Sequence, residues 1–137
     1  MATEQSYWLV KSEPAKYAFS DLQRDGRTMW DGVRNNQAAL YLKAMRVGQK
    51  ALIYHSGDDK AAVGLAEVTR EAFIDPSDPA GRFVAVEIAP ERSLKRPVTL
   101  AELRERLPGM VMFRQFRLSV SPVTDAEWAR IVELSGG

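Results

Sequence analysis

Met29-Trp30-Asp31-Gly32-Val33-Arg34-Asn35-Asn36-Gln37-Ala38 is the stretch from which the rest of the chain can be understood. Between Trp30 and Asn35 it places an aromatic ring, a carboxylate, a glycine, a guanidinium and an amide, and a helical pattern follows at once. Ordinary core or surface segments do not need this mixture. A site for a flat polar ligand does, because the ligand needs a ring to stack on and hydrogen-bonding groups around its edge.

Trp30 also has a plainer interpretation as a buried core ring, because tryptophan is highly buried on average. Its neighbours Asp31 and Arg34 favour a binding role, because they are polar and precede a helix N-terminus, where free backbone N–H groups attract acceptor oxygens. Gly32 permits close approach of the backbone. The alternative for Arg34 is a structural ion pair with Asp31 or Glu13.

Two other strand ends carry polar groups that could converge on Trp30. The aromatic and β-branched run at residues 7–11 leads into Lys11-Ser12-Glu13, and the apolar run at residues 51–55 leads into Tyr54-His55-Ser56. Small barrels hold ligands at their mouths, where such strand ends meet. Two alternatives stay open, namely a solvated strand end for the first group and a structural hydrogen-bonding role for the lone histidine.

The pattern of short strands and helices predicts an α+β fold. Strands are expected at residues 7–11, 28–30, 51–55, 63–68, 83–89 and 117–120, with Pro122 ending the last. Helices are expected to start at Ser20, Asn35, Thr99 and Thr124. The length predicts one domain, residues 1–137, in which five to six strands form a small, strongly bent barrel with flanking short helices.

Composition excludes several classes of protein. The chain has no cysteine, so it has no disulfide, thiol nucleophile or cysteine-ligated metal. Its 19 basic and 18 acidic residues give a net charge of +1. This charge is too low for a protein that binds nucleic acid through phosphate contacts alone. We expect no signal peptide, no membrane span and a cytoplasmic location, with the nucleoid reached from there.

The sequence offers little for catalysis. His55 is the single histidine, and neither a nucleophile elbow, a phosphate-binding loop nor a dinucleotide fingerprint is present. We therefore expect no metal and no cofactor. A basic and aromatic segment near the C-terminus, with Arg114 and Arg117 beside Phe113 and Phe116, resembles a surface for nucleic acid, although a charge run is usually only a solvated face.

At this point the chain resembles the EVE-domain family, which includes thymocyte nuclear proteins. The resemblance covers nearly the whole chain. It rests on residues 7–14 (YWLVKSEP), 30–35 (WDGVRN) with 37–38 (QA), 54–56 (YHS), 64–68 (GLAEV), 94–98 (LKRPV) and 118–123 (LSVSPV).

The resemblance implies a PUA-like fold and kinship with YTH domains, which read methylated adenine in RNA. It also implies recognition of a modified base, chiefly a modified cytosine such as 5-methylcytosine in DNA. Trp30 would then stack on an extruded base. The residues expected to bind the base are Lys11, Ser12, Glu13, Trp30, Asp31, Gly32, Val33, Asn35, Tyr54, His55 and Ser56, and those expected to meet the nucleic-acid backbone are Arg34, Arg114 and Arg117.

The sequence thus predicts a non-enzymatic, monomeric reader of a modified base, with DNA favoured over RNA and any effector supplied by a separate protein. Three alternatives stay open. They are an RNA-binding PUA-like module in RNA modification or translation, a small-molecule enzyme that uses His55 and Ser56, and a domain that only bridges protein partners.

Overall fold

A computed structural model describes residues 6–137 of the chain and shows one six-stranded sheet with five short helices. Residues 1–5, and with them the start of the chain on which the signal-peptide prediction rests, lie outside the described part. The strands are β1 (Tyr7–Ser12), β2 (Thr28–Trp30), β3 (Lys50–His55), β4 (Ala61–Ile74), β5 (Val84–Thr99) and β6 (Val120–Val123). The helices are α1 (Phe19–Asp25), α2 (Asn36–Ala44), α3 (Leu100–Arg106), α4 (Val111–Arg114) and α5 (Asp125–Leu134).

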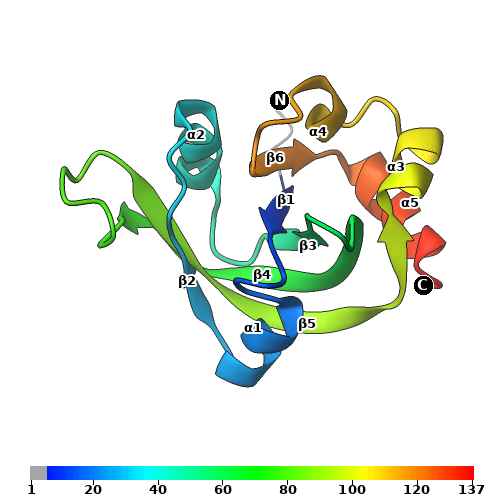
Figure 1. The fold of residues 1–137 in the computed structure, drawn as a ribbon, viewed down its shortest axis with the longest axis horizontal. Coiled ribbons are helices and arrows are strands. Elements are labelled where there is room, and N and C mark those ends of the chain that lie inside the picture. Colours follow the sequence, from blue (N-terminus) through cyan, green and yellow to red (C-terminus); the bar gives the residue numbers. More distant parts are fainter. Residues whose placement is uncertain (1–5) are drawn as a thin grey trace.

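The sheet is bent but open. Its strand order is β2-β5-β4-β3-β1-β6, with β1 and β3 parallel and the other neighbours antiparallel. The strands curl around the middle of the molecule (Figure 1), yet β2 and β6 remain the two edges of the order and are not neighbours. The predicted α+β fold and strand number are confirmed, but the sheet does not close into a barrel.

Both faces of the sheet are buried. Side chains alternate along each strand, so Trp8 and Val10 of β1 join one core while Leu9 between them joins the other. The first core includes Leu22 of α1 and Leu42 of α2, and the second is covered by α3, α4 and α5, which gather on one side of the molecule (Figure 1). Strands buried on both sides explain the continuous apolar run at residues 51–54.

The hairpin of β4 and β5 is longer than predicted. The sequence suggested strands at 63–68 and 83–89, but β5 continues through Pro90 and Pro97. Proline lacks the N–H that a strand ladder uses, so it is tolerated at bulges. The pairing register shifts next to both prolines, between Leu65 and Ala66 and between Ala62 and Gly64. These bulges also bend the sheet.

Local capping explains most helix starts. The Thr99 and Thr124 side chains accept hydrogen bonds from Glu102 and Glu127 N–H groups, as predicted. The prediction for α1 was wrong by two residues, because Asp21 accepts from the Ala18 N–H and moves the cap there.

Two further differences lie near the C-terminus, where the short helix α4 was not predicted and Pro122 lies inside β6. Because β6 is an edge strand, it does not need a ladder bond on both sides and can contain a proline.

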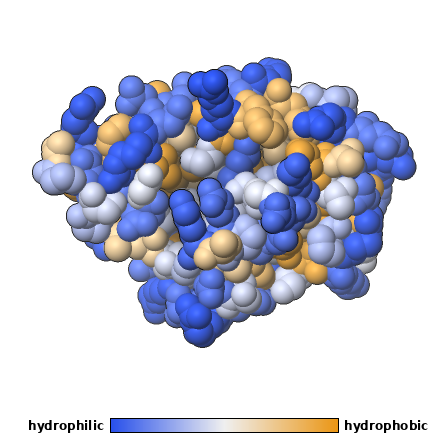
Figure 2. Space-filling view, viewed as in Figure 1, coloured by the Kyte–Doolittle hydropathy of each residue, from blue (hydrophilic) through white to orange (hydrophobic). Residues whose placement is uncertain are grey.

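The surface shows no continuous apolar area on the face in Figure 2, where hydrophobic residues form separate groups among hydrophilic ones. The large hydrophobic side chains exposed in the described part are Met29, Leu40, Val47, Ile74 and Phe116. No helix within residues 6–137 combines the length and apolar character required to span a membrane.

Candidate functional site

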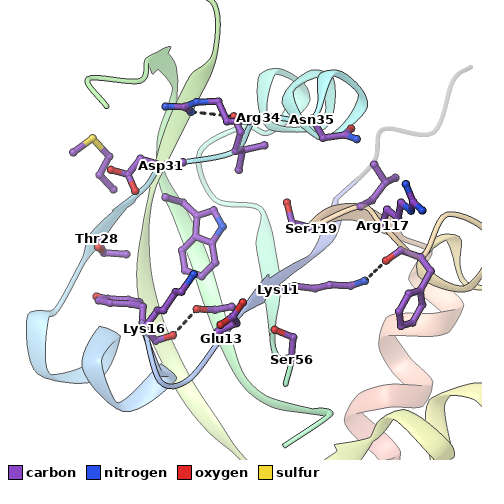
Figure 3. Close-up of a pocket in the computed structure, with 18 residues that line it drawn as sticks. Lys11, Glu13, Lys16, Thr28, Asp31, Arg34, Asn35, Ser56, Arg117 and Ser119 are labelled. Atoms are coloured by element: carbon purple, nitrogen blue, oxygen red, sulfur yellow. Dashed lines mark hydrogen bonds between the residues drawn. The ribbon is translucent and has the colours of Figure 1, made fainter. Parts of the chain in front are cut away.

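A cavity of about 560 Å³ opens beside Trp30, where four separate segments meet. These are the end of β1 with the turn after it, β2 with the loop before α2, the residue after β3, and the segment before β6 (Figure 3). The lining residues are Lys11, Ser12, Glu13, Lys16, Tyr17, Thr28, Met29, Trp30, Asp31, Gly32, Val33, Arg34, Asn35, Ser56, Phe116, Arg117, Leu118 and Ser119. Most of the residues singled out in the sequence therefore come together.

Trp30 belongs both to the core and to the cavity. It ends β2, opposite Val86 of β5, and only 9% of its surface is exposed. It packs in the first core, and its ring meets the ring of Tyr17 edge-on at a centroid distance of 6.4 Å. The two interpretations of Trp30 are thus combined, since most of the ring is fixed by packing and its remaining surface lines the cavity.

Asp75 holds the loop that follows Trp30. Its fully buried carboxylate accepts hydrogen bonds from the Gly32 N–H (2.8 Å), from an Arg34 guanidinium nitrogen (3.0 Å) and from the N–H and hydroxyl of Ser77. Burial opposes ionisation, but the hydrogen bonds from Ser77, Gly32 and Arg34 outweigh it and hold the pKa of Asp75 well below its usual range. Arg34 therefore pairs with Asp75, and not with Asp31 or Glu13 as suggested from the sequence.

Asp75 was missed because it lies in a loop 43 residues away from Gly32. The local signal was present, since Asp75-Pro76-Ser77 has the composition of a turn in which aspartate binds the N–H two residues later. That signal predicts a turn and gives no indication that the carboxylate also binds a distant loop.

The rest of the loop is shaped for its path into α2. Gly32 has a φ of 79°, in the left-handed region that favours glycine. Val33 is buried, while Asn35 caps α2 by accepting a hydrogen bond from the Ala38 N–H at 3.0 Å. Asp31 is exposed, and its carboxylate has no hydrogen bond or ion pair within the described residues, so it is available to a ligand.

Lys11 ties the opposite wall to β1. Its Nζ donates to the Phe116 carbonyl oxygen at 2.9 Å and lies 4.6 Å from the Phe116 ring centroid, and burial lowers the pKa of this amine. Its backbone N–H donates to the Ser119 carbonyl at 2.8 Å. In Figure 3, Lys11 extends across the cavity wall towards the segment that carries Arg117. Lys11 therefore positions this wall as well as lining the cavity.

Tyr54 and His55 do not line the cavity, which corrects the prediction from the sequence. Tyr54 is buried in the second core, on the other face of the sheet. His55 is also buried; its Nε2 accepts from the Phe19 N–H at 3.0 Å, and its Nδ1 lies 3.0 Å from an Asp59 carboxylate oxygen. Both ring nitrogens are thus used structurally, and Ser56 alone of this group reaches the cavity.

The backbone-binding candidates differ in their positions. Arg34 and Arg117 line the cavity, whereas Arg114, exposed at the end of α4, does not. A nucleic-acid contact by Arg114 stays a prediction. Lys16 also lines the cavity and was missed, because a lone lysine in a turn has no distinctive sequence signal.

The described residues contain no group of three or more His, Cys, Asp or Glu side chains placed to hold a metal ion.

Comparisons with known proteins agree with the family resemblance of the sequence. The EVE domain family matches residues 6–134. Thymocyte nuclear protein 1 of Homo sapiens is 32% identical over an alignment covering 94% of this chain and 73% of the relative. Among solved structures, a Rhodopseudomonas palustris protein is 44% identical, with a TM-score of 0.90 and coverage of 96% of this chain and 93% of that one. The human THYN1 protein in complex with DNA containing 5-methylcytosine is 32% identical, with a TM-score of 0.89 and coverage of 96% and 98%. This chain belongs to the EVE domain family.

Proposed function

We propose that this chain is a non-enzymatic module that binds nucleic acid and holds one modified base, a modified cytosine in DNA, in the cavity beside Trp30. The observation that carries the proposal is the cavity itself, in which an aromatic ring fixed by the core stands next to the exposed carboxylate of Asp31. The human THYN1 relative, whose solved structure contains 5-methylcytosine DNA, supports the choice of ligand.

The polar groups that line the cavity suit the hydrogen-bonding edge of cytosine. Carboxylates accept hydrogen bonds from the N4 amine of cytosine, and Asp31 and Glu13 both line the cavity. Apolar lining from Met29, Val33 and Leu118 is suited to a methyl group. A base must leave its stack to enter, which costs a few kcal/mol, and stacking on an aromatic ring returns about 1–3 kcal/mol. Selectivity then depends on the edge contacts.

The test is to measure how tightly labelled duplexes bind when each contains one modified or unmodified cytosine. DNA and RNA oligonucleotides with methylated adenine complete the panel, because only RNA offers a 2′-hydroxyl. We expect the modified cytosine in DNA to bind most tightly. Trp30→Leu should weaken that binding roughly 5- to 150-fold, the equivalent of about 1–3 kcal/mol of stacking.

Trp128→Leu is the matched control, because Trp128 stacks on Tyr7 at a centroid distance of 4.4 Å and does not line the cavity. Thermal unfolding gives the melting temperature of each variant. Binding is then measured well below the lower of the two, where both variants are folded. If folded Trp30→Leu binds the best ligand as tightly as the wild type, the base does not rest on Trp30.

A further inference from the structure

A second, smaller hollow of about 270 Å³ adjoins the cavity. Its lining residues are Asn35, Gln37, Gln115, Phe116, Arg117 and Leu118. Four of these, Asn35, Phe116, Arg117 and Leu118, also line the cavity, so the two spaces share a wall and a rim. We propose that this hollow, called here the flanking subsite, holds the base of the nucleotide next to the one in the cavity. The inference rests on the proposed function.

Phe116 is the first reason. Phe116 is 56% exposed, although phenylalanine is usually much more buried. One side of the ring is covered by the Lys11 amine. Aromatic rings at the edge of a charged groove are platforms on which successive bases of a strand stack, with little dependence on sequence.

The polar groups around Phe116 are the second reason. The side-chain amides of Gln37 and Gln115 are exposed and make no hydrogen bond within the described residues. An amide offers both a donor and an acceptor, so it can pair with the edge of any base. The guanidinium of Arg117 likewise forms no ion pair or hydrogen bond in residues 6–137, and it borders both spaces. That is where the phosphate joining two neighbouring nucleotides would lie.

The segment that forms the subsite is held in place before any ligand arrives. The Lys11 side chain binds the Phe116 carbonyl, the Lys11 N–H binds the Ser119 carbonyl, and the Leu118 N–H donates to the Gln115 carbonyl at 3.1 Å. A preorganised platform does not need to be ordered on binding, which favours affinity. Lys11 therefore links the flanking subsite to the strand that borders the cavity.

Two probes of different length separate the subsite from the cavity. The first is the nucleoside 5-methyl-2′-deoxycytidine, which fills the cavity alone; the second is a trinucleotide with the same base at its centre. Binding is followed by amide chemical shifts in NMR titrations, which measure millimolar affinities and report on the fold of each variant. We expect Phe116→Ala to weaken trinucleotide binding about 5- to 100-fold. The sharper variant is Gln37→Ala combined with Gln115→Ala, because these two residues line the flanking subsite but not the cavity. It should weaken trinucleotide binding about 2- to 10-fold and leave nucleoside binding within about twofold.

Leu40→Ala is the matched control, because Leu40 is a 55% exposed hydrophobic residue on α2 that lines neither space. It should change neither affinity. If the double glutamine variant weakens both probes equally, or neither, the flanking subsite is wrong while the cavity assignment stands. If the wild type binds the modified nucleoside no better than unmodified deoxycytidine, the proposed function fails, and the subsite fails with it.

Discussion

The ring of Phe19 leaves no room for a side chain at Gly64 in β4. A Cβ at Gly64 would lie 2.5–2.6 Å from three ring carbons of Phe19, well inside van der Waals contact. The ring has little room to move, because Phe19 is 5% exposed and its N–H is bound to His55 Nε2. Position 64 thus requires glycine because no side chain fits there. The contact between Gly64 and Phe19 of α1 holds the helix against the sheet.

We predict that Gly64→Ala lowers the free energy of unfolding by about 1–3 kcal/mol, the usual cost of forcing an extra methyl group into a packed core. Urea denaturation followed by tryptophan fluorescence measures the change. Gly109→Ala is the control, because a Cβ there meets no atom within 4 Å and the glycine has no positive φ. Equal stability of the Gly64→Ala variant and the wild type would show that Phe19 can withdraw at no cost.

The loop between β4 and β5 and the loop between β2 and α2 act together through Asp75. Because bonds to Ser77, Gly32 and Arg34 outweigh burial, the folded protein keeps the pKa of Asp75 below the value of about 4 that the unfolded chain has. Because the pKa of Asp75 is lower in the folded state, its carboxylate contributes its full stabilisation at pH values above the pKa of the unfolded chain. This stabilisation is lost as the pH falls below about 4 towards the lower folded value.

We predict that Asp75→Asn costs about 2–4 kcal/mol at pH 7, because it removes a buried charge and leaves Arg34 without its partner. The difference from the wild type should shrink between pH 4 and pH 2.5. Urea denaturation across this pH range, with Asp58→Asn in an exposed turn as the control, makes the measurement. A difference that stays constant with pH would mean that the asparagine fails through shape and not through charge. The same variant should weaken ligand binding at pH 7, because the loop that carries Asp31 is released.

The elements that could be predicted from the sequence are those set by nearby residues. Thr99, Thr124 and Asn35 each bind an N–H three residues ahead, and a contact of that range is visible in the sequence. The length of β5 could not be predicted, because the bulges that accommodate Pro90 depend on the partner strand.

The site divides in the same way. Trp30 and its loop, together with Lys11 and Ser12, combine unusual residue types within short stretches, and the structure places them around one cavity. The Asp75 clamp joins positions 43 residues apart, and the Lys11 bond to Phe116 spans 105. Nothing local in the sequence indicates such contacts. His55 was assigned to the pocket because it follows an apolar strand, but its bonds to Phe19 and Asp59 turn it away from the cavity.

At the scale of the whole molecule, fewer of the cations near the cavity are free to contact a phosphate than its composition suggests. Of the four cations that line it, Arg34 is paired with Asp75 and Lys11 is bound to Phe116. The side chains of Lys16 and Arg117 form no ion pair or hydrogen bond in the described part of the chain. With a net charge of +1 the protein has no general attraction for phosphate, so few backbone contacts should accompany the base.

This distribution predicts a weak salt dependence. Each phosphate contact contributes about 0.7–0.9 to the slope of log affinity against log salt concentration, so two free cations give a slope of about −1.4 to −1.8. Arg117→Gln should reduce its magnitude by about 0.7–0.9. Arg130→Gln on α5, whose side chain pairs with Glu133 and lines neither hollow, should leave it unchanged. Fluorescence anisotropy of a labelled 5-methylcytosine duplex between 50 and 300 mM salt, about a sixfold range, gives the slopes. A wild-type slope steeper than about −4 would require several more phosphate contacts, and the base in the cavity would then contribute only a minor part of the affinity.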